Sequence, residues 1–240
     1  CHLLKGLNLM KNKVAIVGSG NIGWALRKLL QDDYDISQGD ILDGLDAADS
    51  SQVEKFLIGH EAVISAGPYA VNKNIAKVAA EKNIGYFDLT EDVDTTEFIK
   101  ELKSESVLMP QCGLAPGAIN ICAANMMEEF DDVKEVLMRV GALPRFTTNE
   151  MSYYLSWSTN GLINEYCNEA DAIYEGKPIK VMPLEGSEKL VIEGESFEAF
   201  NTSGGCATMC ETYADKVENL TYKTIRLSLI HISEPTRPID

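Results

Sequence analysis

Residues 10 to about 122 alternate short apolar runs with longer stretches in which apolar residues recur every three or four positions. Short apolar runs are typical of buried strands, and the recurring spacing is typical of amphipathic helices. Because the two patterns take turns, they predict parallel strands joined by crossover helices. The expected strands are 13–17, 34–37, 61–66, 85–89 and 106–110, and the expected helices are 22–30, 50–58, 71–82, 93–103 and 118–127.

The pattern changes from residue 133, where strand-like runs dominate. Several strands with a few helices are typical of an α+β domain. The expected strands are 133–140, 151–157, 180–184 and 189–193, and the expected helices are 160–174 and 204–213. We therefore expect a second domain of a different class, which would cover a cleft in the first.

A glycine-rich loop follows the first expected strand, and it has the spacing Gly-x-Gly-x-x-Gly. In a dinucleotide site, Gly18 makes the tight turn, Gly20 lets the backbone approach a pyrophosphate, and Gly23 lets the helix pack closely. A strand before the motif and a helix after it make this interpretation more specific than a ligand-free turn. The expected cofactor contacts are Gly18, Ser19, Gly20, Asn21, Ile22 and Gly23.

These signals predict an α/β protein with a doubly wound, Rossmann-type parallel sheet followed by an incomplete α+β substrate domain. We expect the dinucleotide-binding domain to span residues 10–122 and the partial substrate or dimerisation domain to span residues 123–226.

Asp40, just beyond the second expected strand, indicates which dinucleotide is bound. A carboxylate at this position accepts hydrogen bonds from the ribose of NAD, whereas the 2′-phosphate of NADP usually requires a nearby arginine. The next four residues are Ile, Leu, Asp and Gly, which offer no cation. The sequence therefore predicts NAD rather than NADP.

Three unusual loops follow expected strands: 66–69 (Ala-Gly-Pro-Tyr), 88–92 (Asp-Leu-Thr-Glu-Asp) and 112–117 (Cys-Gly-Leu-Ala-Pro-Gly). Ligands of open α/β sheets bind outside the carboxyl ends of the strands, so these loops are candidates for a site. Each also has a structural alternative: an ordinary Gly-Pro turn, a helix cap by Asp88 or Thr90, and a helix-start Pro116. We expect Ala66, Gly67 and Pro68 to pass beside the ribose and nicotinamide.

Charge and composition narrow the classes of partner. The formal net charge of −16 argues against nucleic acid and anionic membranes, because both repel an acidic surface. No apolar run approaches the roughly 20 residues of a membrane span. Six scattered cysteines without a Cys-x-x-Cys pair indicate reduced thiols and a cytoplasmic location. With only three histidines, we expect no metal site and no Ser-His-Asp triad.

Both ends of the chain look foreign. Met10 is a candidate true start, so residues 1–9 would be a non-native leader. Residues 227–240 resemble a translated sequencing adapter, so we expect the natural sequence to break near Arg226 and the chain to be a fragment.

Five strings together resemble the saccharopine dehydrogenase family, and within it members similar to lysine 6-dehydrogenase. They are 14–23, 66–69, 86–92 (Tyr-Phe-Asp-Leu-Thr-Glu-Asp), 113–117 (Gly-Leu-Ala-Pro-Gly) and 157–164 (Trp-Ser-Thr-Asn-Gly-Leu-Ile-Asn). The resemblance covers residues 10 to about 226. It implies a nicotinamide-dependent oxidoreductase acting on the C–N bond of an amino acid or secondary amine, usually as a homodimer. Family members usually continue well past Arg226.

The implied chemistry needs a group that binds the substrate amine or removes its proton near neutral pH. For amine contact or proton transfer we expect Asp88 and Glu91, and for backbone around the nicotinamide we expect Gly113. The expected substrate contacts are Tyr69, Thr90, Asp92, Trp157 and Asn160. Trp157 has the alternative role of a core residue. The substrate itself stays open, because lysine, saccharopine and polyamine-like amines share a cationic amine.

The same sequence signals are also compatible with other functions. The fold would also suit a carboxynorspermidine-type reductase or an epimerase-like enzyme. Tyr69 and Lys73 have the Tyr-x3-Lys spacing of short-chain dehydrogenases, but they follow the third strand, whereas that family has the pair much later. A protein of another class, a non-catalytic redox-sensing module that binds NAD(H), is a further alternative, as is an incompletely folded fragment without function.

Overall fold

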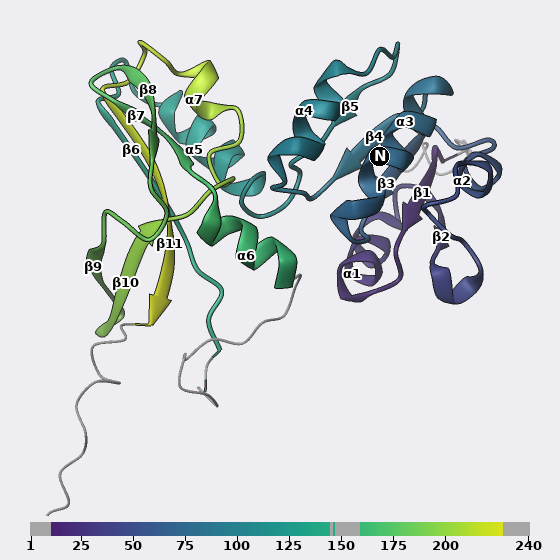
Figure 1. The fold of residues 1–240 in the computed structure, drawn as a ribbon, viewed down its shortest axis with the longest axis horizontal. Helices are drawn as coiled ribbons and strands as arrows, with labels where there is room; N and C mark the ends of the chain where they lie inside the picture. The colour runs from purple at the N-terminus through teal and green to yellow at the C-terminus, as the bar shows by residue number, and fades with distance from the viewer. Residues whose placement is uncertain (1–10, 145, 147–158, 228–240) are drawn as a thin grey trace, which may run out of the picture. The chain divides into compact units, whose positions relative to one another are not determined.

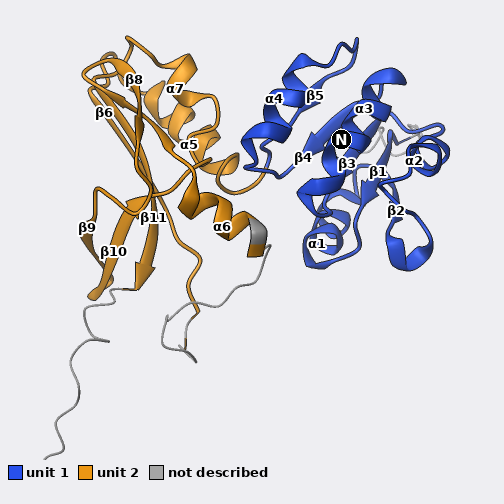
Figure 2. Cartoon of the chain, in the orientation of Figure 1, with its two compact units in different colours: residues 1–112 blue, residues 113–240 orange. Residues whose placement is uncertain are grey.

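The computed structural model of the chain describes residues 11–144, 146 and 159–227 (Figure 1). They fall into two compact units, one ending at Cys112 and the other beginning at Gly113 (Figure 2). Within the described residues, no helix is both long enough and apolar enough to cross a membrane.

The first unit is a five-stranded sheet in which every pair of neighbours is parallel. Its strands are β1 (Lys13–Val17), β2 (Asp35–Gly39), β3 (Ala62–Ser65), β4 (Gly85–Asp88) and β5 (Leu108–Met109), in the order β2-β1-β3-β4-β5. The chain moves to β2 on one side of β1 and to β3 on the other, so β1 borders the topological switch point at which such folds bind ligands. The predicted Rossmann-type sheet is confirmed.

Four α-helices and two short 3₁₀ turns connect these strands. The helices are α1 (Asn21–Leu30), α2 (Ser50–Phe56), α3 (Asn72–Glu81) and α4 (Val93–Glu101), and the turns are η1 (Ile41–Asp43) and η2 (Tyr69–Val71). All four helices were expected, with bounds that differ at their ends. Helix α3 packs between α2 and α4.

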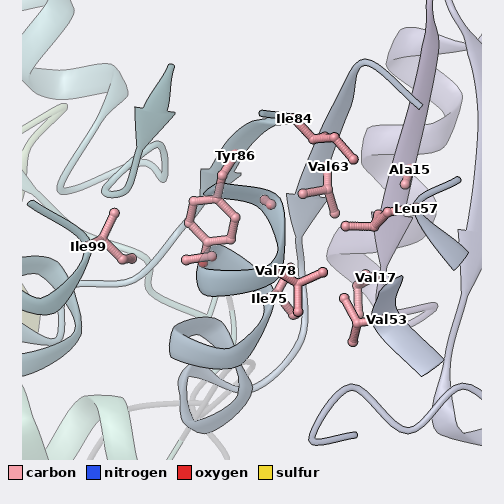
Figure 3. Packing of buried hydrophobic residues seen from close by; sticks show 12 residues of the cluster. Ala15, Val17, Val53, Leu57, Val63, Ile75, Val78, Ile84, Tyr86 and Ile99 are labelled. Carbon is pink, nitrogen blue, oxygen red and sulfur yellow. The ribbon is translucent and has the colours of Figure 1, made fainter. Parts of the chain in front are cut away.

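The core of the first unit lies between the sheet and helices α2 to α4 (Figure 3). Its buried members include Ala15 and Val17 of β1, Val63 of β3, Val53 of α2 and Ile75 of α3. Strand alternation and helix periodicity place these residues on the inner faces, which is why the pattern predicted the elements. Tyr86 of β4 belongs to the same cluster and is completely buried.

The described residues of the second unit form a six-stranded sheet and three helices. The strands are β6 (Glu135–Val140), β7 (Ala170–Tyr174), β8 (Lys177–Val181), β9 (Glu188–Ile192), β10 (Glu195–Asn201) and β11 (Asn219–Leu227), and the helices are α5 (Ala118–Met127), α6 (Thr159–Cys167) and α7 (Met209–Thr212). The order is β8-β7-β11-β10-β9, with β6 paired in parallel to β11 and the other pairs antiparallel. The predicted α+β class is confirmed.

The helix expected over 160–174 is wrong in its second half, because α6 ends at Cys167 and residues 170–174 form β7. Glu175 and Gly176 both have positive φ angles, of 49° and 79°. Two such residues make the tight turn of a hairpin, and this turn pairs β7 with β8. Pairing across the turn therefore overrides the helical pattern of the segment.

Other differences also come from strand pairing. The expected helix 204–213 is reduced to α7, and strands β10 and β11 were not expected. Leu227, the first residue of the expected foreign tail, pairs with Phe197 of β10. The expected strand 151–157, the expected leader 1–9 and the rest of the tail lie outside the described residues.

The boundary between the units lies ten residues before the expected one, because α5 belongs to the second unit. Asn120 of α5 is buried and donates hydrogen bonds from Nδ2 to the main-chain oxygens of Gly205 (3.0 Å) and Cys206 (3.2 Å). These bonds tie the helix to a loop more than 80 residues away in the chain. The continuous helical pattern of 118–127 predicted the helix but not the unit on which it packs.

Replacing Glu188 with glutamine is expected to destabilise the second unit by about 2 kcal/mol at neutral pH. Its carboxylate accepts hydrogen bonds from Arg139, and also from Nζ of Lys223 at 2.8 Å. Both cations are largely buried, so the variant leaves two positive charges without a counter-ion. Arg139 first, and Lys223 in addition, lower the pKa of Glu188 below its ordinary value.

A lowered pKa fixes the sign of the pH dependence. The stabilisation is present above the pKa of Glu188 in the unfolded chain and is lost as pH falls through the lower pKa of the folded state. The loss of unfolding free energy in Glu188→Gln should therefore appear at neutral pH and vanish in strong acid. Urea unfolding at several pH values measures it, with Glu195→Gln, an exposed glutamate on β10, as the control. A pH-independent difference would contradict the ionic explanation.

Candidate functional site

The glycine loop after β1 packs closely against the loop after β3. Gly18 has a φ of 111°, a conformation that favours glycine. A Cβ atom at Gly18 would lie 2.8 Å from the carbonyl carbon and oxygen of Ala66. The structure therefore brings together the predicted loops after β1 and β3, and it leaves no room for a side chain between them.

Helix α1 begins directly at this loop. Gly20 is its N-cap and supplies no side-chain hydrogen bond, and the first intrahelical bond runs from the N–H of Trp24 to the oxygen of Gly20. The N–H groups of residues 21–23 precede that bond, so helix geometry leaves them available to an anion. A Cβ atom at Gly20 would meet nothing within 4 Å, which leaves open space over the helix start.

Gly23 is required by the loop as well as by the helix. A Cβ atom at Gly23 would lie 2.0 Å from the carbonyl oxygen of Gly18, which also accepts a hydrogen bond from Nε2 of Gln38 (2.9 Å). The expected close approach thus occurs against the backbone of the loop itself. Gln38 was not singled out from the sequence, because its only signal is its position at the end of β2.

Asp40 is connected directly to the glycine loop. Its Oδ2 accepts a hydrogen bond from the N–H of Ser19 (2.8 Å), and its Oδ1 accepts one from the N–H of Leu42 (3.1 Å). The bonds from Leu42 and Ser19, in that order, lower the pKa of Asp40, so the side chain is ionised at neutral pH. Each carboxylate oxygen has two lone pairs, which leaves acceptor capacity for a pair of hydroxyl groups.

Asp88 is completely buried, and both of its carboxylate oxygens accept hydrogen bonds from the protein. Oδ2 accepts from the hydroxyl of Tyr86 (2.7 Å) and from Nδ2 of Asn72 (3.2 Å), and Oδ1 accepts from the N–H groups of Thr90 (3.0 Å) and Gln111 (3.1 Å). Burial is the largest influence on its pKa, which is raised. This geometry does not favour the expected contact of Asp88 with a substrate amine.

Two of the expected substrate contacts have structural roles in the same loop. Asp92 is the N-cap of α4, where its Oδ2 accepts from the N–H (2.9 Å) and the hydroxyl (2.6 Å) of Thr95. Thr90 is buried, and its hydroxyl oxygen accepts from the N–H of Asp92 (3.0 Å). The cap that was expected of Asp88 or Thr90 is therefore made by Asp92.

Glu91 lies between these two residues and is only half-buried. Burial raises the pKa of its carboxyl group, and the neighbouring charge of Asp92 raises it further. A partly dehydrated carboxylate beside another acid is suited to bind a cation or to accept a proton. Of the acidic residues in the 88–92 loop, Glu91 is the one that the described hydrogen bonds leave suited to contact a ligand.

The remaining expected residues divide between the units. Tyr69 is half-buried in η2, between Pro68, which is exposed, and helix α3. Gly113 begins the second unit, where it forms a bridge with Gly117. Trp157 lies outside the described residues. Asn160 lies within α6, but its side chain is not among the described parts of the chain.

The sequence did not reveal the partners of Asp88. Tyr86 carried a usable signal, because residues two apart on a strand point to the same face. Asn72 and Gln111 carried none, and neither did Ser65, which bonds to Asn72, since these residues come from separate elements and meet only in the folded unit.

Comparison with known proteins places these observations in a family. Residues 113–235 match the family model described as the saccharopine dehydrogenase C-terminal domain. The chain is 30% identical over 148 residues to the saccharopine dehydrogenase (NADP(+), L-glutamate-forming) of Saccharomyces cerevisiae and 26% identical over 152 residues to that of Schizosaccharomyces pombe. These matches cover 55% and 57% of this chain but only 32% of each relative.

A solved structure shares the fold. The apo saccharopine dehydrogenase (L-Glu forming) from Saccharomyces cerevisiae matches with a TM-score of 0.69 at 22% identity. The match covers 90% of this chain and 55% of that chain, so this chain spans about half the length of that relative.

Proposed function

This chain belongs to the saccharopine dehydrogenase family, and from that premise we propose that it is a nicotinamide-dependent oxidoreductase acting on the C–N bond of an amino acid or secondary amine. The observation that carries the proposal is the assembly of Gly18, the start of α1 and the ionised Asp40 around one loop. This assembly has the parts that a dinucleotide requires: anion-binding N–H groups and a ribose acceptor.

We propose NAD as the preferred cofactor. Asp40 is ionised and stands one hydrogen bond from the glycine loop, so a 2′-phosphate on the adjacent ribose would meet a like charge. The names of the two yeast relatives specify NADP(+), so the proposed preference for NAD would distinguish this chain from them.

Different residues of the first unit would bind the cofactor and the substrate in such a reaction. The N–H groups at the start of α1 bind the pyrophosphate, and Asp40 orients the ribose. Bound NAD supplies the acceptor for a hydride from the carbon that carries the amine. Glu91 holds the ammonium group or takes its proton, and Tyr69 contacts the substrate. Within the family, we propose a substrate of the lysine or saccharopine class, because both present a cationic amine.

The test of the function is amine-dependent reduction of NAD by the purified protein, followed through NADH absorbance with lysine and saccharopine. We expect turnover with at least one of them and stronger binding of NADH than of NADPH. NADH binding without turnover on any amine, carboxynorspermidine included, would favour a redox-sensing module instead. Dimerisation and a cytoplasmic location stay predictions.

Replacing Glu91 with glutamine is expected to raise KM for the amine about 10-fold or more, because a charged hydrogen bond is worth about 1.5–3 kcal/mol. NADH affinity should not change. The raised pKa of Glu91 also means that amine binding weakens as pH falls through that pKa, and this acid limb should disappear in the variant. Steady-state kinetics across pH measures both effects.

Asp94→Asn is the matched control, since Asp94 is an exposed acid in the first turn of α4. It should leave KM and the acid limb as in the unmodified protein. Equal behaviour of Glu91→Gln and Asp94→Asn would remove Glu91 from the proposed site.

A further inference from the structure

A chain of buried polar side chains crosses the first unit from β3 to the residues after β5. The hydroxyl of Ser65 donates to Oδ1 of Asn72 (2.7 Å), and Nδ2 of Asn72 donates to Asp88 (3.2 Å). Ser65, Asn72 and Tyr86 are each at most 2% exposed, and Asp88 is not exposed at all. Such a network is costly to bury unless each member is satisfied, and here the members satisfy one another.

The contacts of Asp88 reach three separate loops at one edge of the sheet. Asn72 begins α3 and closes the loop that carries Gly67 to Tyr69. Thr90 belongs to the loop that carries Glu91, and Gln111 follows β5. The main-chain oxygen of Asp88 also accepts from the N–H of Cys112 (2.7 Å). One residue therefore holds the ends of β3, β4 and β5 together.

The chemistry of this junction requires a carboxylate. All four groups that contact the two side-chain oxygens are donors: a phenol, an amide and two backbone N–H groups. An ionised carboxylate can accept all four, whereas an amide has one acceptor oxygen and would serve at most two. If that oxygen keeps the two backbone N–H groups, the hydroxyl of Tyr86 still has an acceptor in the main-chain oxygen of Asn72 (3.4 Å), whereas Nδ2 of Asn72 would lose its partner at a cost of about 1–3 kcal/mol.

We propose that Asp88 is a positioning residue, a buried hydrogen-bond acceptor that holds the loops 66–72, 89–92 and 111–112 in the arrangement needed for turnover. It acts through Glu91 and Tyr69 and does not touch the substrate. The hydrogen bonds of Asp40 and the glycine loop described above do not involve this junction. The loop 66–72 does contact the glycine loop at Gly18, so the effect on cofactor binding is expected to be smaller than the effect on turnover, but not absent. The activity part of this inference rests on the proposed function, and the structural part does not.

The experiment uses Asp88→Ala in the whole chain, with two measurements, because an amide oxygen in the place of Oδ1 would keep the bonds from both Thr90 and Gln111. Amide hydrogen exchange should accelerate at Thr90 and Gln111, which lose a carboxylate acceptor, and should stay slow at Cys112, whose acceptor is the main-chain oxygen. The kcat/KM for the amine should fall on the order of 100-fold, as expected for loops displaced by about 1 Å, with the Kd for NADH changed by no more than about threefold.

Tyr86→Phe is the milder companion, because it removes one of the four donors and keeps the carboxylate. It should fold, and its exchange and kcat/KM should change in the same direction by a smaller factor. Asp94→Asn again serves as the control for loss of a nearby charge.

The possible results distinguish failure of the proposed role of Asp88 from failure of the proposed function. Unchanged exchange at Thr90 and Gln111 in both variants overturns the role of Asp88, and so does faster exchange with unchanged kcat/KM. A fall in NADH affinity equal to the fall in kcat/KM also overturns it, since that is general loss of structure. If the unmodified chain turns over no amine, the proposed function fails, and the amide exchange alone decides the role of Asp88.

Discussion

Replacing Gly23 with alanine is expected to weaken NADH binding by about 100-fold or more. The added methyl group would lie 2.0 Å from the carbonyl oxygen of Gly18. Both partners are backbone, so relief requires a shift of the loop or of the start of α1, at a cost of about 1–3 kcal/mol or more. Either shift moves the N–H groups of residues 21–23 away from the pyrophosphate, and 1.4 kcal/mol corresponds to a factor of ten in affinity.

Two other glycine variants make this prediction specific. Gly85→Ala adds the same methyl group in β4, where its contacts would begin at an ordinary 3.5 Å, so NADH binding should be unaffected. Gly20→Ala has open space around it and an ordinary φ of −66°, so it should fold normally and still bind NADH less well if the cofactor lies over the helix start. Fluorescence titration with NADH and the unfolding midpoint of each variant are the measurements. Normal NADH affinity in Gly23→Ala would exclude this loop as the cofactor site.

Replacing Asp40 with serine is expected to shift the ratio of NADPH to NADH affinity toward NADPH by on the order of 100-fold. Two unit charges about 4 Å apart repel by about 1 kcal/mol in water and about 4 kcal/mol near a protein surface, and the 2′-phosphate carries more than one charge. Serine retains a helix-capping oxygen for η1, so the turn that follows should keep its structure. Titration of both reduced cofactors measures the ratio.

The position of the charge, and not only its sign, is tested by a neighbour. Asp43 is exposed in the same short turn, and Asp43→Ser removes one negative charge without touching Ser19. Its effect on the cofactor ratio should be no more than about threefold and should fade with added salt, because exposed charges are screened over about 10 Å. An Asp40→Ser protein that still prefers NADH by the original factor would show that Asp40 does not select the cofactor.

The parallel unit was accessible from the sequence because its signals are local. Each strand and each crossover helix carries its own apolar period, and the glycines of the loop lie within six residues of one another. The second unit was less accessible, since β7 is defined by a turn at Glu175 and Gly176 and by pairing with β8. Strand β11 likewise gains its identity from β6, which precedes it by more than 80 residues.

The acidic loop 88–92 shows the same division within the candidate site. The residue pattern offered no reason to assign different roles to its three carboxylates, and all three were expected to contact or act on the substrate. The structure makes Asp92 a helix cap, buries Asp88 in a network and leaves Glu91 half-buried. Nothing in the order of residues separates these roles, because each depends on what surrounds the side chain.

By itself, the sequence determined the class of the first unit, the glycine loop and the acid that follows it, since strand and helix periods and glycine spacing act over a few residues. Only the tertiary structure decided the assignment of α5 to the second unit and the roles of the three acids. Two of the four partners of Asp88 lie 16 and 23 residues away in the chain, at Asn72 and Gln111. Burial and hydrogen bonding determine whether a side chain is ionised and whether it can contact a ligand. Both burial and hydrogen bonding arise only when distant segments pack together.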